Sequence, residues 1–146
     1  MKTFDFGSGP VPAHRHQNPD GKSIGGWVAN TASVADTATV GTEARIYGNA
    51  QVSSKAKIFG NAQVYGKARI SGKAWVYGNA IVFGEAQVFD NAQVFGSALV
   101  FDKAQVYNSA NVYGTAKVFD DAKISGNTKL SSTVLPTCPA PSILGW

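Results

Sequence analysis

An aliphatic residue occurs at every sixth position over most of this chain. The series begins at Val28 and ends at Leu130, and its 18 members follow one another without an insertion or deletion. An alanine lies four residues after each member, from Ala32 to Ala122. A period of six fits neither a helix with 3.6 residues per turn nor a plain alternating strand. It fits a short strand followed by a turn, repeated along the chain.

Each unit contains its own strand and turn signals. In residues 62–65, Ala-Gln-Val-Tyr, side chains alternate between small or aliphatic and polar or aromatic, as a strand with one buried face requires. The position after this stretch is Gly, Asn or Asp in 15 of the 18 units. These residues tolerate positive φ angles, so a turn is predicted at the end of every unit.

The composition agrees with this architecture and disfavours a helical bundle. The 146 residues include 20 Ala, 15 Val and 16 Gly but only 4 Leu. Only 15% of residues are charged, against roughly 25% in an average soluble domain. Aromatic residues make up 11% of the chain, which argues against disorder.

The repeat resembles the hexapeptide repeat of left-handed parallel β-helices, in which three units form one triangular coil. Units such as Val-Tyr-Gly-Asn-Ala, at residues 76–80, resemble the YdcK-like variant of that family, a group often labelled as transferases. The expected fold is therefore an all-β, left-handed parallel β-helix (a β-solenoid) of about six triangular coils. Residues 1–27 are expected to form a loop-rich N-terminal arm that caps the helix, residues 28–135 the helix itself, and residues 136–146 a C-terminal tail.

Three units per coil would stack residues 18 apart on one outer face. Val and Ala already fill the interior, so the aromatic residues must point outward. The first face would carry Tyr47, Tyr65, Phe83, Phe101 and Phe119, with Ile81 and Leu99 beside them. The third would carry Phe59, Tyr77, Phe95 and Tyr113, with Trp75 alongside. The second face is more polar, with Ser53, Ser71 and several glutamines.

Two aromatic faces predict an interaction surface, because large apolar patches on soluble proteins usually contact something. The family commonly forms parallel homotrimers, which implies a homotrimer whose neighbouring subunits cover both aromatic faces. The favoured function is a non-enzymatic structural or binding module for a protein partner, such as a phage or cell-surface component, or for a small ligand between subunits. An alternative is that the stacked aromatic residues bind a saccharide or nucleotide.

The second alternative, implied by the resemblance, is an acyl-CoA-dependent acyltransferase with a histidine base. The sequence disfavours this activity, because the repeat has no loop insertions and contains no histidine. The only histidines are His14 and His16, in the N-terminal arm, and they are weak candidates for a general base. No cofactor is expected.

Metal, nucleic-acid and membrane sites receive little support. Two histidines cannot supply the three that hold zinc in related carbonic anhydrases. Asp102 and Asp120 would stack on one corner, where a turn role explains them. Lysines and arginines are scattered, which disfavours nucleic acid. No apolar run is long enough to span a membrane, and the first residues do not resemble a signal peptide. The single cysteine, Cys138, fits a reducing cytoplasmic location.

Overall fold

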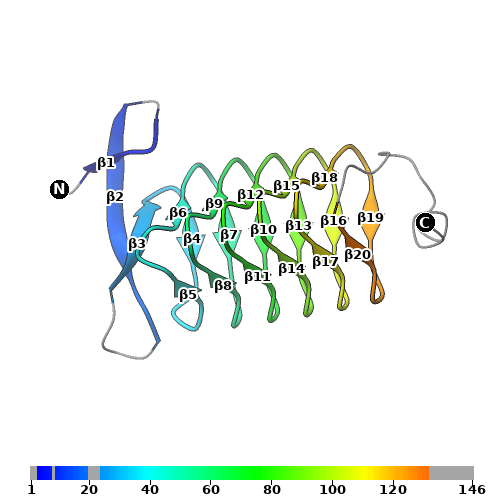
Figure 1. The fold of residues 1–146 in the computed structure, drawn as a ribbon. Helices are drawn as coiled ribbons and strands as arrows, with labels where there is room; N and C mark the ends of the chain where they lie inside the picture. Colours follow the sequence, from blue (N-terminus) through cyan, green and yellow to red (C-terminus); the bar gives the residue numbers. More distant parts are fainter. Residues whose placement is uncertain (1–2, 8, 20–23, 132–146) are drawn as a thin grey trace.

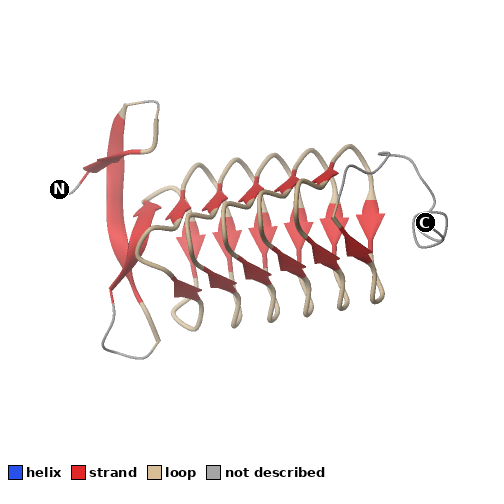
Figure 2. Ribbon diagram, in the orientation of Figure 1, coloured by secondary structure: helices blue, strands red, loops and turns tan. Residues whose placement is uncertain are grey.

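The computed structural model describes residues 3–7, 9–19 and 24–131, and the regular elements within these ranges are strands (Figures 1 and 2). Three strands form the N-terminal end: β1 (Thr3–Asp5), β2 (Pro10–Gln17) and β3 (Ile24–Ala29). Every later strand has two residues, one pair for each six-residue unit. These strands are β4 (Ser33–Val34), β5 (Thr39–Val40), β6 (Arg45–Ile46), β7 (Gln51–Val52), β8 (Lys57–Ile58), β9 (Gln63–Val64), β10 (Arg69–Ile70), β11 (Trp75–Val76), β12 (Ile81–Val82), β13 (Gln87–Val88), β14 (Gln93–Val94), β15 (Leu99–Val100), β16 (Gln105–Val106), β17 (Asn111–Val112), β18 (Lys117–Val118), β19 (Lys123–Ile124) and β20 (Lys129–Leu130).

The strands form three sheets because each strand pairs with the strand three units further along the chain. The first sheet runs β3-β6-β9-β12-β15-β18, the second β4-β7-β10-β13-β16-β19 and the third β5-β8-β11-β14-β17-β20. The pairing is parallel, and the paired residues are 18 apart, as in Ile81 with Leu99. The prediction of a parallel β-solenoid of about six turns is therefore confirmed. Its left hand and triangular section stay predictions from the family resemblance.

The core is the narrow interior between the three sheets. It is filled by the aliphatic residue and the alanine of each unit, and Val64, Ala68 and Ile70, for example, are completely buried. Small alanines beside β-branched residues allow the sheets to approach closely, and buried parallel strands are typically rich in such aliphatic residues. The periodic positions of the sequence are thus the core of the fold.

The turns adopt the positive φ angles that the sequence predicts, but only from the fourth unit onward. Gly66 has a φ of 70° and Asp102 a φ of 57°. The corresponding turn residues of the first three units are Asn30, Asp36 and Thr42. The structure describes all three, and none of them has a positive φ. At the first of these turns the Thr31 hydroxyl donates a hydrogen bond of 2.5 Å to the Gly48 carbonyl oxygen. At this turn, the hydrogen bond to the next coil is therefore made by a side chain.

The N-terminal segment contains more regular structure than its prolines and glycines indicate, so the expected loop-rich arm needs correction. Strand β2 pairs antiparallel with both β1 and β3, and this closes the N-terminal edge of the first sheet (Figure 1). The edge of the third sheet is closed by side chains from the same segment, described below. The predicted arm is therefore a folded cap over the first coil.

The described residues end at position 131. The tail at 136–146, the end of the predicted helix at 132–135 and Cys138 lie outside the described residues. Within the part of the chain that the structure describes, no helix is long and apolar enough to cross a membrane.

Candidate functional site: the aromatic ladders

Five aromatic residues predicted for the first face stack in one ladder along the first sheet. Ring centroids are 4.7 Å apart for Tyr47 and Tyr65, 5.1 Å for Tyr65 and Phe83, and 5.0 Å for Phe83 and Phe101. Phe119 continues the ladder at 5.4 Å from Phe101. The parallel register causes this spacing, because equivalent residues of successive coils lie one strand spacing apart. We call this set the first ladder.

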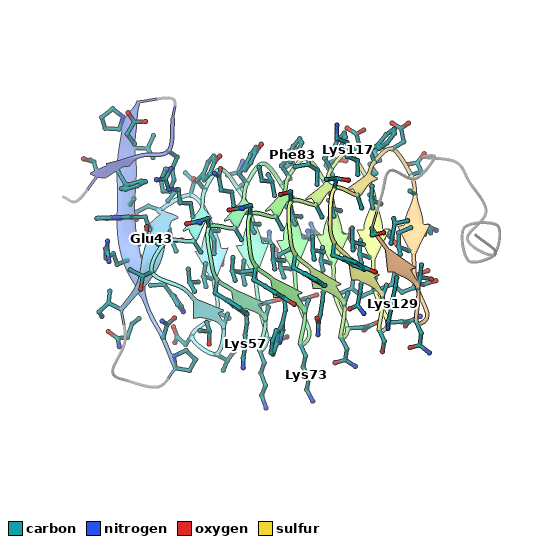
Figure 3. The ribbon with its side chains drawn as sticks, in the orientation of Figure 1. Glu43, Lys57, Lys73, Phe83, Lys117 and Lys129 are labelled. Atoms are coloured by element: carbon teal, nitrogen blue, oxygen red, sulfur yellow. The ribbon has the colours of Figure 1, made fainter. Side chains whose placement is uncertain are left out.

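Ile81 and Leu99 lie beside the first ladder, opposite each other on β12 and β15. Both side chains are half-buried and point outward, since Val82 and Val100 next to them fill the core. Together with Phe83 they form an apolar area in the middle of the first sheet. Phe83 stands on the outer surface of the solenoid in Figure 3.

The third sheet carries the second predicted group. Phe59, Tyr77, Phe95 and Tyr113 stack with centroid distances of 4.9, 4.9 and 5.1 Å, and we call them the third ladder. Trp75 meets the ring of Phe59 edge-on at 5.6 Å. The Lys57 ammonium lies 5.2 Å from the Trp75 ring centroid, so a cation covers part of this face.

The ladders are less exposed than the sequence suggested. The rings are half-buried, because each ring covers the faces of its neighbours in the stack. Among the described residues, only Val11 and Ile24 are large apolar side chains with high exposure, at 38% and 47%. The ladders therefore present ring edges to solvent. A sugar or base could stack only on an end ring, since the internal ring faces are occupied.

Burial also affects the tyrosine hydroxyls of the first ladder. Desolvation raises the pKa of Tyr47, with a further contribution from Tyr65, while Arg45 opposes it. Desolvation raises the pKa of Tyr65 as well. The Tyr47 hydroxyl donates a hydrogen bond of 3.2 Å to the Gln63 side-chain oxygen.

The N-terminal cap extends the first ladder, which sequence reasoning missed. Phe6 stacks on Tyr47 at 4.7 Å, and Phe4 stacks on Trp27 at 5.0 Å. Phe6, Tyr47 and Val11 help to line an apolar cavity of about 310 Å³ beneath the cap. The spacing of Phe4 and Phe6 could have indicated this extension from the sequence, because a strand places residues two apart on the same side.

The two histidines have separate roles in the cap and do not meet. His16 is buried, and its Nε2 donates a hydrogen bond of 2.7 Å to the Ala38 carbonyl oxygen, which can only accept. His14 is exposed, and its Nδ1 lies 2.8 Å from the Asn30 side-chain oxygen. His16 thus holds the first coil in place, and this geometry adds no support to a histidine base.

The buried Asn18 completes this contact. Its amide nitrogen donates to the Val40 carbonyl oxygen at 3.1 Å, and its oxygen accepts from the Val40 N–H at 2.9 Å. Asn18 thus imitates a strand residue at the free edge of the third sheet. Because Asn18 lies outside the repeat, the periodicity could not identify it.

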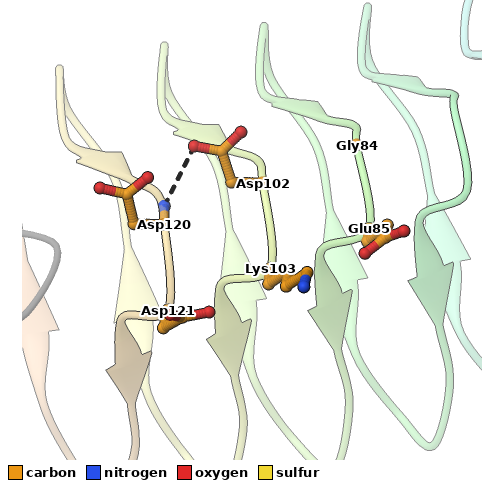
Figure 4. A pocket seen from close by; sticks show the side chains of 6 residues that line it. All are labelled: Gly84, Glu85, Asp102, Lys103, Asp120 and Asp121. Carbon is orange, nitrogen blue, oxygen red and sulfur yellow. Dashed lines mark hydrogen bonds between the residues drawn. The ribbon is translucent and has the colours of Figure 1, made fainter.

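Carboxylates gather at the turn between the first and second sheets, as Figure 4 shows. The Asp120 N–H donates to a carboxylate oxygen of Asp102 at 3.2 Å, which confirms a turn role for Asp102. Desolvation, a hydrogen bond with Asp102 and repulsion from Asp102 and Asp121 raise the pKa of Asp120. Within the described ranges, no group of three or more His, Cys, Asp or Glu could hold a metal ion.

These observations place the predicted aromatic residues in two ladders on a parallel β-solenoid, and family comparison identifies the repeat that builds it. Residues 62–78 match the YdcK beta solenoid repeat. The YdcK repeat segment contains β9, β10 and β11, which is one complete turn with one strand in each sheet. The resemblance stated for the sequence is therefore confirmed for the repeat. Comparison with curated proteins and with solved structures gave no match.

Proposed function

We propose that this chain is a self-assembling β-solenoid module and that its copies meet through the first and third sheets. The module acts as a structural or binding element, with a protein partner or small ligand held at the grooves between subunits. The observation that carries the proposal is the uncharged area of the first sheet, where Ile81 and Leu99 lie beside the rings of Phe83 and Phe101.

The second sheet provides the contrast within the same molecule. Its outward positions include Arg69 on β10 and Lys123 on β19, both exposed, and serines occupy three positions equivalent to the rings. An interface is expected to exclude charge from its centre, as the first sheet does, while a solvent-facing surface carries it. The second sheet is therefore assigned to solvent.

A homotrimer uses both aromatic sheets, because each subunit contacts one neighbour with each. A stable contact buries about 800 Å² per partner. The described chain has an accessible surface of 7409 Å², so two such contacts would cover roughly a fifth of it. The ladders extend over several coils of both sheets, which gives an elongated contact area along the solenoid axis.

Light scattering on the full chain tests the proposal. The expected mass is about 46 kDa, three times the 15.3 kDa of one chain. Phe83→Glu and Phe101→Glu should each lower the mass to that of one chain, because each places a carboxylate in the apolar contact. Circular dichroism should show that the solenoid remains folded.

Phe89→Glu is the matched control. Phe89 occupies the equivalent position on the second sheet and stacks on Tyr107 at 5.0 Å, so its replacement also removes a stacked ring. The mass of this variant should stay at three chains. A single-chain mass for the unaltered protein, or equal effects of Phe101→Glu and Phe89→Glu, would overturn the assignment of the faces.

A further inference from the structure

A column of alternating charges runs along the turn between the first and second sheets. Lys67, Glu85, Lys103 and Asp121 occupy the same turn position in four successive coils, and all four side chains are exposed. Figure 4 shows Glu85, Lys103 and Asp121 in one row. We call these four residues the charged ridge.

The two ends of the charged ridge have opposite charge. Arg69 on β10 lines the same groove as Lys67, so one end is basic. Asp102 and Asp120 lie beside Asp121 at the other end and line a shared hollow, so that end is acidic. Glu85 lines the same hollow, which therefore holds four of the nine Asp and Glu side chains of the chain. Within the part of the chain that the structure describes, no ion pair joins the side chains of the ridge.

The ridge is complementary to itself when it is reversed. A two-fold axis that passes between the second and third members places Lys67 of one copy opposite Asp121 of the other, and Glu85 opposite Lys103. The coils pair without a register shift from β6 to β20, so the spacing is regular and all four contacts can form together. At the adjacent turn position, the same four coils carry Gly66, Gly84, Asp102 and Asp120. The reversed arrangement therefore places each of these aspartates opposite a glycine, with no like charge facing it.

We propose that the charged ridge is a docking surface for a second copy of this chain, in an antiparallel two-fold arrangement. The charge pattern selects this register. A shift by one coil would place Lys67 opposite Lys103 and Glu85 opposite itself. A parallel arrangement in register would place every charge opposite its own kind. A parallel arrangement shifted by one coil pairs opposite charges, but it generates an open filament and leaves the ridge ends unpaired.

This contact does not depend on the proposed assembly through the aromatic sheets. The ridge lies at a turn, while Ile81 and Leu99 lie in the middle of the first sheet. A two-fold contact at the ridge would therefore join two single chains into a dimer, and it would link a homotrimer, which carries three ridges, to further homotrimers. Since the pairs are exposed, the contact should weaken strongly as salt rises and the Debye length shortens from about 10 Å at 0.1 M to about 3 Å at 1 M.

Sedimentation velocity of the full chain at high protein concentration tests the proposal. The mass should at least double at low salt relative to 1 M salt, because a single chain carries one ridge and a homotrimer carries three. Lys67→Glu and Asp121→Lys should each abolish the doubling, because each creates two like-charge contacts across the axis. An equimolar mixture of the two variants should restore it, since Glu at 67 then faces Lys at 121 in the partner. Rescue by mixing shows that the contact lies between chains.

Lys73→Glu is the control for net charge. Lys73 is an exposed lysine at the equivalent turn position between the second and third sheets, away from the ridge (Figure 3). This variant should double its mass at low salt as the unaltered chain does. Phe101→Glu should keep the salt-sensitive doubling even if the aromatic contact is lost. Equal masses at both salt concentrations, or no recovery in the mixture, would overturn the proposed ridge contact.

Discussion

Asn18 closes the free edge of the third sheet, so its replacement tests the physical account of the N-terminal cap. The Asn18→Ala variant removes the donor to the Val40 carbonyl oxygen and the acceptor for the Val40 N–H. Val40 is completely buried. Leaving a buried backbone group without a partner costs about 1 to 3 kcal/mol. Two such groups would cost about 2 to 6 kcal/mol, and water entering the vacated space lowers this to about 2 to 4 kcal/mol.

Urea unfolding at 25 °C measures this loss in the free energy of unfolding, and amide hydrogen exchange locates it. Exchange should accelerate at the Val40 N–H, while Val88 in the middle of the solenoid should stay protected, because each coil contacts only its neighbours. Asn30→Ala is the control, since Asn30 is exposed and contacts His14; its expected cost is below about 0.5 kcal/mol. Equal losses in the two variants would refute the reasoning about the edge.

Two further predictions concern the turns. Gly78→Ala should destabilise the protein by about 1 to 3 kcal/mol in urea unfolding, because Gly78 has a φ of 68° and an added Cβ would lie 2.9 Å from the Gly96 nitrogen. Asn79→Ala, at the exposed neighbouring position, should be nearly neutral, and a loss as large as that of Gly78→Ala would contradict the steric explanation. Asp120→Asn should raise the melting temperature at pH 7 and have no such effect near pH 3. The raised pKa of Asp120 means that its protonated form favours the fold, so its contribution to stability is present at low pH and is lost as pH rises through that pKa. A gain that persists unchanged at pH 3 would show that repulsion between carboxylates is not its cause.

The solenoid could be predicted from the sequence because each structural contact is repeated. A strict six-residue period, combined with the three units per coil that the family resemblance implies, fixes which residues are neighbours across strands. It therefore places Tyr65 above Phe83, and Ile81 opposite Leu99, before any coordinates are considered. The same period predicts a turn in each unit, and Gly or Asp at those turns accounts for the positive φ angles from the fourth unit onward.

The cap could not be predicted in the same way, because its contacts occur once. His16 and Asn18 bind backbone groups 22 residues away, and neither spacing belongs to the repeat. The prolines and glycines around them are typical of loops, yet residues 10–17 form a strand with its edges paired on both sides. Free strand edges at the end of a solenoid require partners, and this requirement identifies a cap without identifying its residues.

The stacking of the rings has a consequence for the proposed interface that the sequence did not reveal. Because each internal ring already covers its neighbours, a second subunit can bury only ring edges and the aliphatic side chains of Ile81 and Leu99. The gain per residue is then smaller than for a fully exposed ring, since the hydrophobic contribution follows the apolar area removed from water. An interface of this kind must extend over several coils to be stable. A short solenoid that retained only two coils of the first ladder should therefore fail to assemble, even with every ring of those coils intact.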